Sequence, residues 1–268
     1  MAKSFTLART LRAGETVFLG WVGIPDALFI ETVARSAFGA VCIDMQHGWH
    51  STDSVHDGIR AVVLADKAVV VRVPVGDFAF ASRALDMGAE AIIAPMINTV
   101  ADAEALADAT KYPPIGKRSW GPGRATALTG LAANDYLAWT RENILTFAMI
   151  ETVEAIRNVE AILDVPGIDG VFVGPSDLSL TLSEGGFIDA LSPTIHGAVT
   201  RIVEAAKSKN KLAAMFGASP AHASAIAAQG YQLVSIGGDI NYVTKGCNDL
   251  IAEAQGGAAT AALSKGGY

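Results

Sequence analysis

Four side chains that can do acid-base or metal chemistry stand at or near the ends of short apolar runs. They are His47, Arg72, Glu151 and Asp177. Two carboxylates with a single imidazole and no thiolate make an oxygen-rich site, which suits Mg²⁺ or Mn²⁺ better than zinc. A substrate with adjacent carboxylate and carbonyl oxygens can chelate an ion that keeps open positions. We therefore expect chemistry on an enolate whose negative charge the ion stabilises.

Three of the polar residues also have simpler interpretations. Arg72 lies within the apolar run 69–73, where its guanidinium holds an oxyanion or reaches the rim and pairs with a helix carboxylate, because burying it unpaired is costly. His47 is a natural proton shuttle near neutral pH, or a loop histidine that bonds to the backbone. Asp44 is a metal ligand, or a hydrogen-bonding group that supports the ligands.

These side chains meet only if the fold brings several strand ends to one face. Short β-branched runs alternate with longer Ala-rich stretches of helical period, a pattern typical of parallel strands joined by crossover helices. We predict eight strands, at Val17–Ile24, Ala40–Met45, Ala68–Val73, Ala91–Met96, Leu145–Ile150, Gly170–Gly174, Leu212–Gly217 and Gln232–Gly237. Eight strand and helix pairs in about 250 residues predict a single-domain α/β protein, a (β/α)8 TIM barrel.

Helices are expected between the strands, at Pro25–Phe38, Phe78–Met87 and Thr99–Lys111, with Thr99 as the N-cap of the third. A terminal helix is expected at Asn241–Ala254, after the last strand. The barrel is expected to fill residues 1–255, and the Ala/Gly-rich tail 256–268 either frays or packs on a neighbouring subunit. The alternative fold is an open doubly wound sheet. It is disfavoured because no Gly-rich phosphate turn follows the first strand.

Composition excludes several classes of protein. Lys and Arg total 20 against 27 Asp and Glu, for a net charge of -7, and no basic tract favours nucleic acid or anionic lipid. No apolar run approaches the roughly 20 residues that cross a bilayer, and Met1–Glu15 is no secretory signal. Cys42 and Cys247 make no disulfide framework. We expect a soluble cytoplasmic protein whose partners are small molecules, with no nucleic acid and no membrane.

In combination and in order, the motifs of this chain resemble the metal-dependent (class II) 2-oxo acid aldolases of the HpcH/HpaI family, in the pyruvate/phosphoenolpyruvate barrel superfamily. The resemblance covers nearly the whole chain. Its carriers are Ile43-Asp44-Met45-Gln46-His47, Val71-Arg72, Leu85-Asp86-Met87-Gly88-Ala89, Ala94-Pro95-Met96, Tyr112-Pro113-Pro114, Gly116-Lys117-Arg118, Met149-Ile150-Glu151-Thr152 and the segment from Asp169 to Leu178.

The resemblance implies a role for each residue of the motifs. Glu151 and Asp177 bind a divalent metal ion (Mg²⁺, Mn²⁺ or Co²⁺), His47 is the catalytic base, Asp86 makes that base stronger, and Arg72 stabilises the enolate. The implied reaction is reversible aldol cleavage of a 4-hydroxy-2-oxo acid to pyruvate and an aldehyde. The family also implies a homohexamer with exchanged terminal helices, for which the helix 241–254 is the candidate.

Substrate contacts are implied in the same way. The backbone amides of Ser176 and Asp177 hold the pyruvate carboxylate, and Trp21 lines the pocket. The chain departs from the family at Met149, where many members have a glutamine that bonds the substrate, so substrate choice is expected to differ. Arg118 and Arg124, in the Gly-rich segment between strands four and five, contact the aldehyde or are solvated loop arginines.

Other chemistries remain as alternatives. Decarboxylation of oxaloacetate, or a related addition, passes through the same metal-bound enolate and uses the same residues. Cleavage of a CoA thioester lacks a basic segment to support it, and a phosphate site at Ser235–Asp239 would meet the charge of Asp239. A non-catalytic binding barrel would tolerate loss of both acids. A Schiff base is disfavoured, because Lys67 and Lys211 precede strands and so lie at the wrong end of the barrel.

Overall fold

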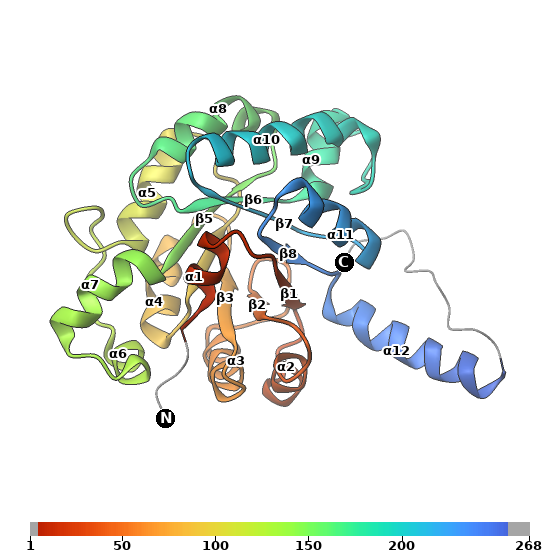
Figure 1. The fold of residues 1–268 in the computed structure, drawn as a ribbon, viewed down its shortest axis with the longest axis horizontal. Coiled ribbons are helices and arrows are strands. Elements are labelled where there is room, and N and C mark those ends of the chain that lie inside the picture. Colours follow the sequence, from red (N-terminus) through yellow and green to blue (C-terminus); the bar gives the residue numbers. More distant parts are fainter. Residues whose placement is uncertain (1–4, 257–268) are drawn as a thin grey trace.

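A computed structural model describes residues 5–256 of the chain. Eight parallel strands close into a barrel in chain order, and helices surround it (Figure 1). The strands are β1 (Val17–Val22), β2 (Ala40–Asp44), β3 (Ala68–Arg72), β4 (Ala91–Ala94), β5 (Leu145–Ile150), β6 (Gly170–Val173), β7 (Leu212–Met215) and β8 (Leu233–Ser235). The predicted single-domain barrel is confirmed, and the open sheet is wrong because β1 also pairs with β8.

Most strands are shorter than predicted at their carboxyl ends, because the chain leaves the ladder there to form the loops of the mouth. β5 has the predicted bounds. β1 stops at Val22, the last residue paired with β2, and the next two amides, of Gly23 and Ile24, donate to the carboxylate of Asp239 instead (2.8 and 2.7 Å). The sequence predicts a longer strand because the apolar residues continue after the backbone amides change their hydrogen-bond partner.

Twelve α-helices are present in the described residues. They are α1 (Leu7–Arg12), α2 (Ala27–Ala34), α3 (Thr52–Leu64), α4 (Phe78–Met87), α5 (Val100–Thr110), α6 (Gly123–Thr129), α7 (Ala133–Asn143), α8 (Val153–Asp164), α9 (Pro175–Leu182), α10 (His196–Ser208), α11 (Pro220–Gln229) and α12 (Asp239–Ala254). α4 has the predicted bounds. Thr99 caps α5 in a capping box with Asp102, as the sequence indicates. α2 begins at Ala27 because the Asp26 carboxylate caps it, and it ends at Ala34, before the predicted end at Phe38.

Two segments hold helices that the sequence interpretation missed. α1 carries Leu7 and Leu11 into the cluster of side chains inside the barrel, so it closes the end opposite the strand carboxyl termini. The predicted Gly-rich loop between β4 and β5 ends at Gly123, where α6 begins, and Arg124 therefore lies on a helix.

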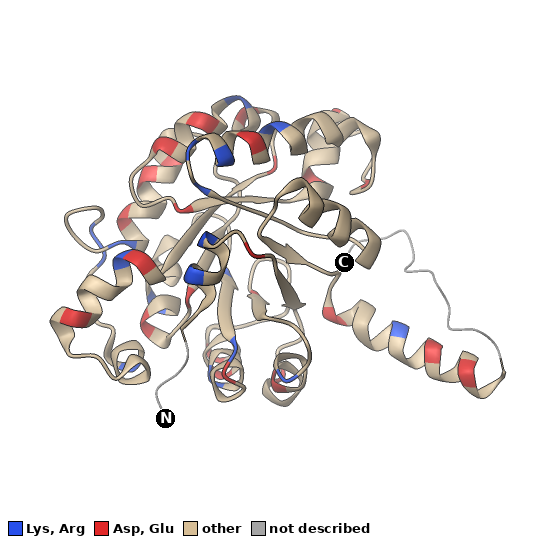
Figure 2. Ribbon diagram, in the orientation of Figure 1, with Lys and Arg blue, Asp and Glu red and all other residues tan. Residues whose placement is uncertain are grey.

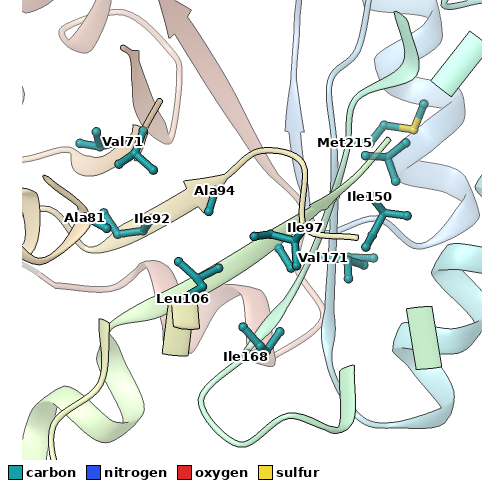
Figure 3. Close-up of a cluster of buried hydrophobic side chains, with 14 of the residues drawn as sticks. Val71, Ala81, Ile92, Ala94, Ile97, Leu106, Ile150, Ile168, Val171 and Met215 are labelled. Carbon is teal, nitrogen blue, oxygen red and sulfur yellow. The ribbon is translucent and has the colours of Figure 1, made fainter. Parts of the chain in front are cut away.

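The strands are buried on both faces, which explains their near-continuous apolar sequence. Alternate residues point into the barrel or toward the helices. On β3, Val70 belongs to the inner cluster, whereas Val69 and Val71 belong to the outer one. Figure 3 shows part of this outer cluster, between the strands and helix α5. By this alternation the next side chain, Arg72, points inward with Val70.

Charged residues lie mostly on the outer helices and connecting loops, and the strands carry few (Figure 2). Within residues 5–256, no helix is long and apolar enough to cross a membrane. α12 extends away from the barrel (Figure 1). The domain boundary at residue 255 stays a prediction, since the tail 256–268 lies outside the described residues except for Gly256.

Candidate active site

Side chains from the carboxyl ends of five strands and from the start of α9 surround one small cavity. It is lined by Trp21, Arg72, Met149, Phe172, Gly174, Pro175, Ser176, Asp177 and Phe216. The open space is only about 10 Å³, roughly what one water molecule needs. Its walls are aromatic on one side, because Trp21 packs on Phe172 and Phe216 with ring centroids 5.6 and 5.2 Å apart.

Arg72 is held inside the barrel by a two-pronged bond to Asp44. The two residues face each other in the register of β2 and β3. Arg72 Nε donates to Asp44 Oδ1 (2.8 Å) and Nη2 donates to Oδ2 (2.6 Å). Both side chains are almost fully buried, at 2% and 3% exposure. The pairing of Arg72 with a helix carboxylate at the rim is therefore wrong, because its partner is on the neighbouring strand.

Trp21 completes this arrangement from β1. Its indole nitrogen donates to Asp44 Oδ2 (3.2 Å), and the Arg72 guanidinium lies 4.8 Å from the centre of its ring. Burial alone would raise the pKa of Asp44, but the hydrogen bonds and charge of Arg72 outweigh burial and hold the pKa below its usual value. Asp44 is thus an ionised group that fixes Arg72, and the hydrogen-bonding interpretation of Asp44 accounts for its position.

The loop that carries His47 is fixed by the same carboxylate. Asp44 Oδ1 accepts the backbone N–H groups of Gln46 (3.0 Å) and His47 (3.3 Å). Gly48 approaches the β1 loop so closely that a Cβ atom would lie 2.1 Å from the Asp44 carbonyl oxygen and 2.8 Å from Gly23 Cα. Only glycine fits there. The side chain of His47 is exposed and does not line the small cavity.

Glu151 directly follows β5, and its carboxylate is buried beside the cavity, at 2% exposure. Its Oε1 accepts the backbone N–H of Met96 (2.8 Å). Burial raises the pKa of Glu151 to about 7 and the charge of Asp177 adds to the rise, against the Met96 hydrogen bond and the charge of Arg72. A buried carboxylate next to a second one is the environment that a bound cation relieves.

The residues therefore fit a hard divalent ion. Glu151 Oε2 lies against Gly174, where a Cβ atom would come within 2.5 Å of it. Because glycine has no side chain, there is space for this oxygen. Asp177 follows in the first turn of α9. Among residues 5–256, no group of three or more His, Cys, Asp or Glu is arranged to hold a metal. Two carboxylates, with substrate and water as the other ligands, match the preference of Mg²⁺ for few protein ligands.

Comparison with known proteins gives the family. Residues 18–245 match the model of the HpcH/HpaI aldolase/citrate lyase family. The chain belongs to this family. The hydroxypyruvate/pyruvate aldolase of Rhizorhabdus wittichii is 37% identical over 242 residues, covering 90% of this chain and 95% of that protein. The 2-keto-3-deoxy-L-rhamnonate aldolase of Salmonella schwarzengrund is 31% identical over 246 residues, covering 90% of each.

Solved structures of the HpcH/HpaI family have the same fold. An HpcH/HpaI aldolase/citrate lyase family protein from Burkholderia cenocepacia has a TM-score of 0.84 at 28% identity, and the match covers 94% of this chain and 100% of that one. The curated relatives are named aldolases, and aldolases are carbon–carbon lyases. The predicted enzyme class and the predicted membership of the HpcH/HpaI family are both confirmed.

Asp86, to which the resemblance assigns the role of making His47 a stronger base, does not contact His47 within this chain. Asp86 is in the last turn of α4, which runs back from the β3 mouth for ten residues, about 15 Å at the rise of an α-helix. His47 follows the carboxyl end of β2, at the opposite end of the barrel. Within the protomer the Asp86 carboxylate accepts a hydrogen bond from Arg118 Nη2 (2.6 Å).

Neither arginine of the segment between β4 and β5 lies at the mouth of its own barrel. Arg118 is a buried residue whose guanidinium lies 4.5 Å from the centre of the Tyr112 ring. Arg124 donates to the backbone carbonyl of Met87. Within this chain neither arginine can contact an aldehyde at the mouth of the barrel, and Arg118 is buried rather than a solvated loop arginine. The cause is α5, which carries the chain back to the far end of the barrel before this segment.

The lysines lie where the sequence places them. Lys67 Nζ donates to the carbonyl of Phe38 (2.7 Å) and Lys211 Nζ donates to that of Ile168 (2.5 Å). Both acceptors are in the loops that precede strands, so these lysines are at the end of the barrel away from Glu151.

Sequence reasoning missed several residues of the site. Phe172 and Phe216 form its aromatic wall, and the alternation along β6 could have identified Phe172 as inward-pointing, next to Met149 in the register. Gly174 has a recognisable signal, a glycine between a strand and a Pro-initiated helix. The hydrogen bond from Met96 to Glu151 has no signal in the sequence, because a backbone amide makes it.

Proposed function

We propose that this enzyme cleaves 4-hydroxy-2-oxo acids reversibly to pyruvate and an aldehyde, with a divalent metal ion held by Glu151 and Asp177. The observation that carries the proposal is the buried carboxylate of Glu151, which lies beside the cavity that Asp177 and the fixed cation of Arg72 line. The aldolase names of the curated relatives support it.

When bound, the ion supplies Lewis-acid stabilisation of negative charge on the keto oxygen of the substrate. The carboxylate ligands suit Mg²⁺ or Mn²⁺, and Co²⁺ is the third candidate. The remaining parts of the mechanism are the work of side chains and backbone amides of this chain.

The Arg72 guanidinium is oriented to bind an enolate oxygen before the substrate binds. Its guanidinium cannot lose its charge at physiological pH, and its bonds to Asp44 and its contact with Trp21 fix it in place. A preorganised cation needs no rearrangement as charge develops in the transition state. In this proposal the first-turn amides of Ser176 and Asp177, which have no intrahelical acceptor, bind the pyruvate carboxylate.

Three side chains form the apolar part of the pocket around the reacting carbon. Phe172, Phe216 and Met149 line the cavity and keep bulk water away from the enolate. A dry site also strengthens the attraction of Arg72 for negative charge. Met149 cannot make the hydrogen bond that a glutamine would make to the substrate. We therefore propose that the enzyme prefers substrates whose group facing Met149 is apolar or small.

His47 is proposed as the base that removes the 4-hydroxyl proton. Its ring is exposed on the rim, where the aldehyde half of the substrate would extend from the small cavity. Asp86 lies at the far end of its own barrel, so its proposed effect on His47 requires a second protomer that presents Asp86 to the mouth of the first. We therefore include a homo-oligomer, a hexamer, in the proposal.

The test is a screen of aldehydes with pyruvate after chelator treatment, with and without added Mg²⁺, Mn²⁺ or Co²⁺. The proposal predicts condensation that stops on chelation and returns with at least one of the three ions. Condensation that continues unchanged in excess EDTA would contradict the metal-dependent mechanism.

Decarboxylation of oxaloacetate is a second candidate for the same cavity. The position of His47 outside the small cavity favours this reaction. Loss of carbon dioxide yields the enolate without a base that removes a hydroxyl proton. Exchange of His47 for alanine separates the two activities. We expect this variant to lose aldol cleavage and keep decarboxylation, and equal loss of both would contradict this division of roles.

A further inference from the structure

We propose that the backbone of Met96, held in a left-handed conformation, positions Glu151 so that only Oε2 is left for the metal ion. Met96 is thus a positioning residue that acts through its amide. This inference rests on the metal-dependent function proposed above and adds a group outside the motifs of ligands and base.

The conformation of Met96 is unusual for its residue type. Its φ is +56°, and the only other non-glycine residues with positive φ in the described part of the chain are Asp66, Glu184 and Asn210. Those three are polar and each follows the last turn of a helix, where a left-handed residue commonly ends the helix. Met96 follows the strand β4 and ends no helix, and its side chain gives no local hydrogen bond to offset the steric cost.

The surroundings force this conformation on the loop. Ala94 and Ile97 both belong to the outer core, and Figure 3 shows the chain arching between them with both side chains in that cluster. The next residue, Asn98, is tied to the β5–α8 region, because its carbonyl accepts Asn158 Nδ2 (2.8 Å) and its side chain accepts the Thr152 hydroxyl. Backbone strain of this kind persists only where neighbouring contacts over-determine it, and it is concentrated at functional sites.

The result is an N–H group aimed at a buried carboxylate. Met96 N lies 2.8 Å from Glu151 Oε1, a normal hydrogen-bond length. The other oxygen, Oε2, faces Gly174, on the side of the chain that leads into Asp177. A neutral donor thus occupies one oxygen and orients the carboxylate, while the oxygen on the Asp177 side stays available to a cation. Groups that orient a ligand in this way typically change metal affinity by about 10- to 100-fold.

The test replaces the single amide of Met96 by an ester, by incorporating the α-hydroxy analogue of methionine at position 96. The probe is Mn²⁺, and its dissociation constant is measured by calorimetry and by the electron paramagnetic resonance signal of free Mn²⁺. We expect the ester to weaken Mn²⁺ binding about 10- to 100-fold. Met96→Ala and Met96→Gly keep the amide and should bind Mn²⁺ within about twofold of the wild-type protein.

Thermal unfolding of the metal-free variants gives a second readout. Glycine adopts positive φ without a steric penalty, so Met96→Gly should melt at a higher temperature than Met96→Ala. The reverse order would show that the left-handed backbone at position 96 is not strained and would overturn that part of the proposal.

The outcomes distinguish this inference from the function on which it rests. An ester variant with the wild-type dissociation constant, or a Met96→Ala variant as weak as the ester, would overturn the role of the amide alone. A wild-type protein that binds no Mn²⁺ in either assay would overturn the metal-dependent function and this role together.

Discussion

The charged pair of the site is fixed by hydrogen bonds between neighbouring strands. Arg72 and Asp44 are nearly fully buried and bonded through two contacts, a geometry that suits the planar fork of arginine and no other cation. A buried pair of this type contributes little to net stability, yet the removal of one partner leaves an uncompensated charge. We therefore expect the pair to matter more for the orientation of Arg72 than for folding.

Exchange of Arg72 for lysine tests this expectation. Lysine keeps the charge but cannot keep both bonds to Asp44, so we predict that kcat for pyruvate release falls about 10²- to 10³-fold, the usual effect of losing one oxyanion donor. Arg83→Lys, at an exposed position on α4, is the control and should leave kcat unchanged. An Arg72→Lys variant with wild-type kcat would show that the fixed fork is unnecessary.

At the scale of residues, the sequence indicates which groups matter better than it indicates their partners. An arginine in an apolar strand and two carboxylates after other strands are visible as polar breaks in a buried pattern. The pairing of Arg72 with Asp44 follows from the register of β2 and β3, which no local pattern shows. The motif Ala94-Pro95-Met96 supports the resemblance but does not indicate the bond from Met96 to Glu151, since any residue with an N–H group can supply a backbone donor.

At the scale of elements, the junction of β6 and α9 sets the position of both proposed metal ligands. Gly174 lies between the strand and Pro175, and a Cβ atom there would meet Glu151 Oε2 at 2.5 Å and Met149 Cε at 3.0 Å. Gly174→Ala should therefore displace the Glu151 carboxylate and weaken Mn²⁺ binding by at least about 10-fold in calorimetry.

The matched control for that substitution is Gly197→Ala on α10. Apart from the nearby backbone of its own helix, no atom lies within 4 Å of the Cβ that alanine would add at Gly197, and the substitution should leave Mn²⁺ affinity unchanged. If Gly174→Ala binds Mn²⁺ as tightly as Gly197→Ala does, the space at position 174 is not what seats Glu151.

A histidine in the loop between β2 and α3 makes the free energy of unfolding depend on pH. His50 is 8% exposed and its Nδ1 lies 3.1 Å from Ser54 Oγ. Burial lowers the pKa of His50, although the charges of Asp44 and Asp239 partly oppose the shift. The unfolded chain then binds more protons than the folded one below about pH 6.5, so the free energy of unfolding falls as pH falls through that value.

Replacement of His50 removes its contribution to the pH dependence of the free energy of unfolding. Urea unfolding at about pH 7.5 and about pH 5.5, on either side of the unperturbed histidine pKa, should show a smaller loss of stability for His50→Gln than for the wild-type protein. Equal losses in the two proteins would mean that His50 is protonated as easily in the fold as in the unfolded chain.

Elements with a strong local signal were predicted closely, and those defined by long-range contacts were not. The bounds of α4 and the cap of α5 follow from apolar period and a Thr–Asp capping box. α6 begins in a stretch whose glycines and proline suggest a loop, and packing around Tyr136 holds α6 and α7 in place. Strand ends were overestimated because apolar sequence continues beyond the last paired residue.

At the scale of the whole molecule, the barrel could be predicted because it is a repeat of one unit. Alternating strand and helix patterns leave few closed arrangements, and the structure has the expected one. The proposed oligomer cannot be derived this way. Asp86 lies far from His47 in the chain's own barrel. Helix α12, whose exposed apolar residues include Val243, Leu250 and Ile251, extends away from the barrel (Figure 1).

The proposal that Asp86 acts across protomers makes a prediction for mixed assemblies. His47→Ala and Asp86→Asn should each lose most aldol cleavage alone. When they are co-expressed, random pairing in a symmetric oligomer restores both groups at about a quarter of the sites, and pyruvate release should recover to a similar share. Mixed assemblies that stay as inactive as either parent would place the two groups in one protomer or remove Asp86 from the reaction.

The central claim is that Glu151 and Asp177 hold one catalytic metal ion. The most direct measurement is Mn²⁺ titration of the wild-type protein, Glu151→Gln and Asp177→Asn, with pyruvate release from a 4-hydroxy-2-oxo acid followed on the same samples. We predict one Mn²⁺ per wild-type chain, and loss of both the ion and pyruvate release in each variant. Full metal-dependent pyruvate release in the two variants would contradict the account.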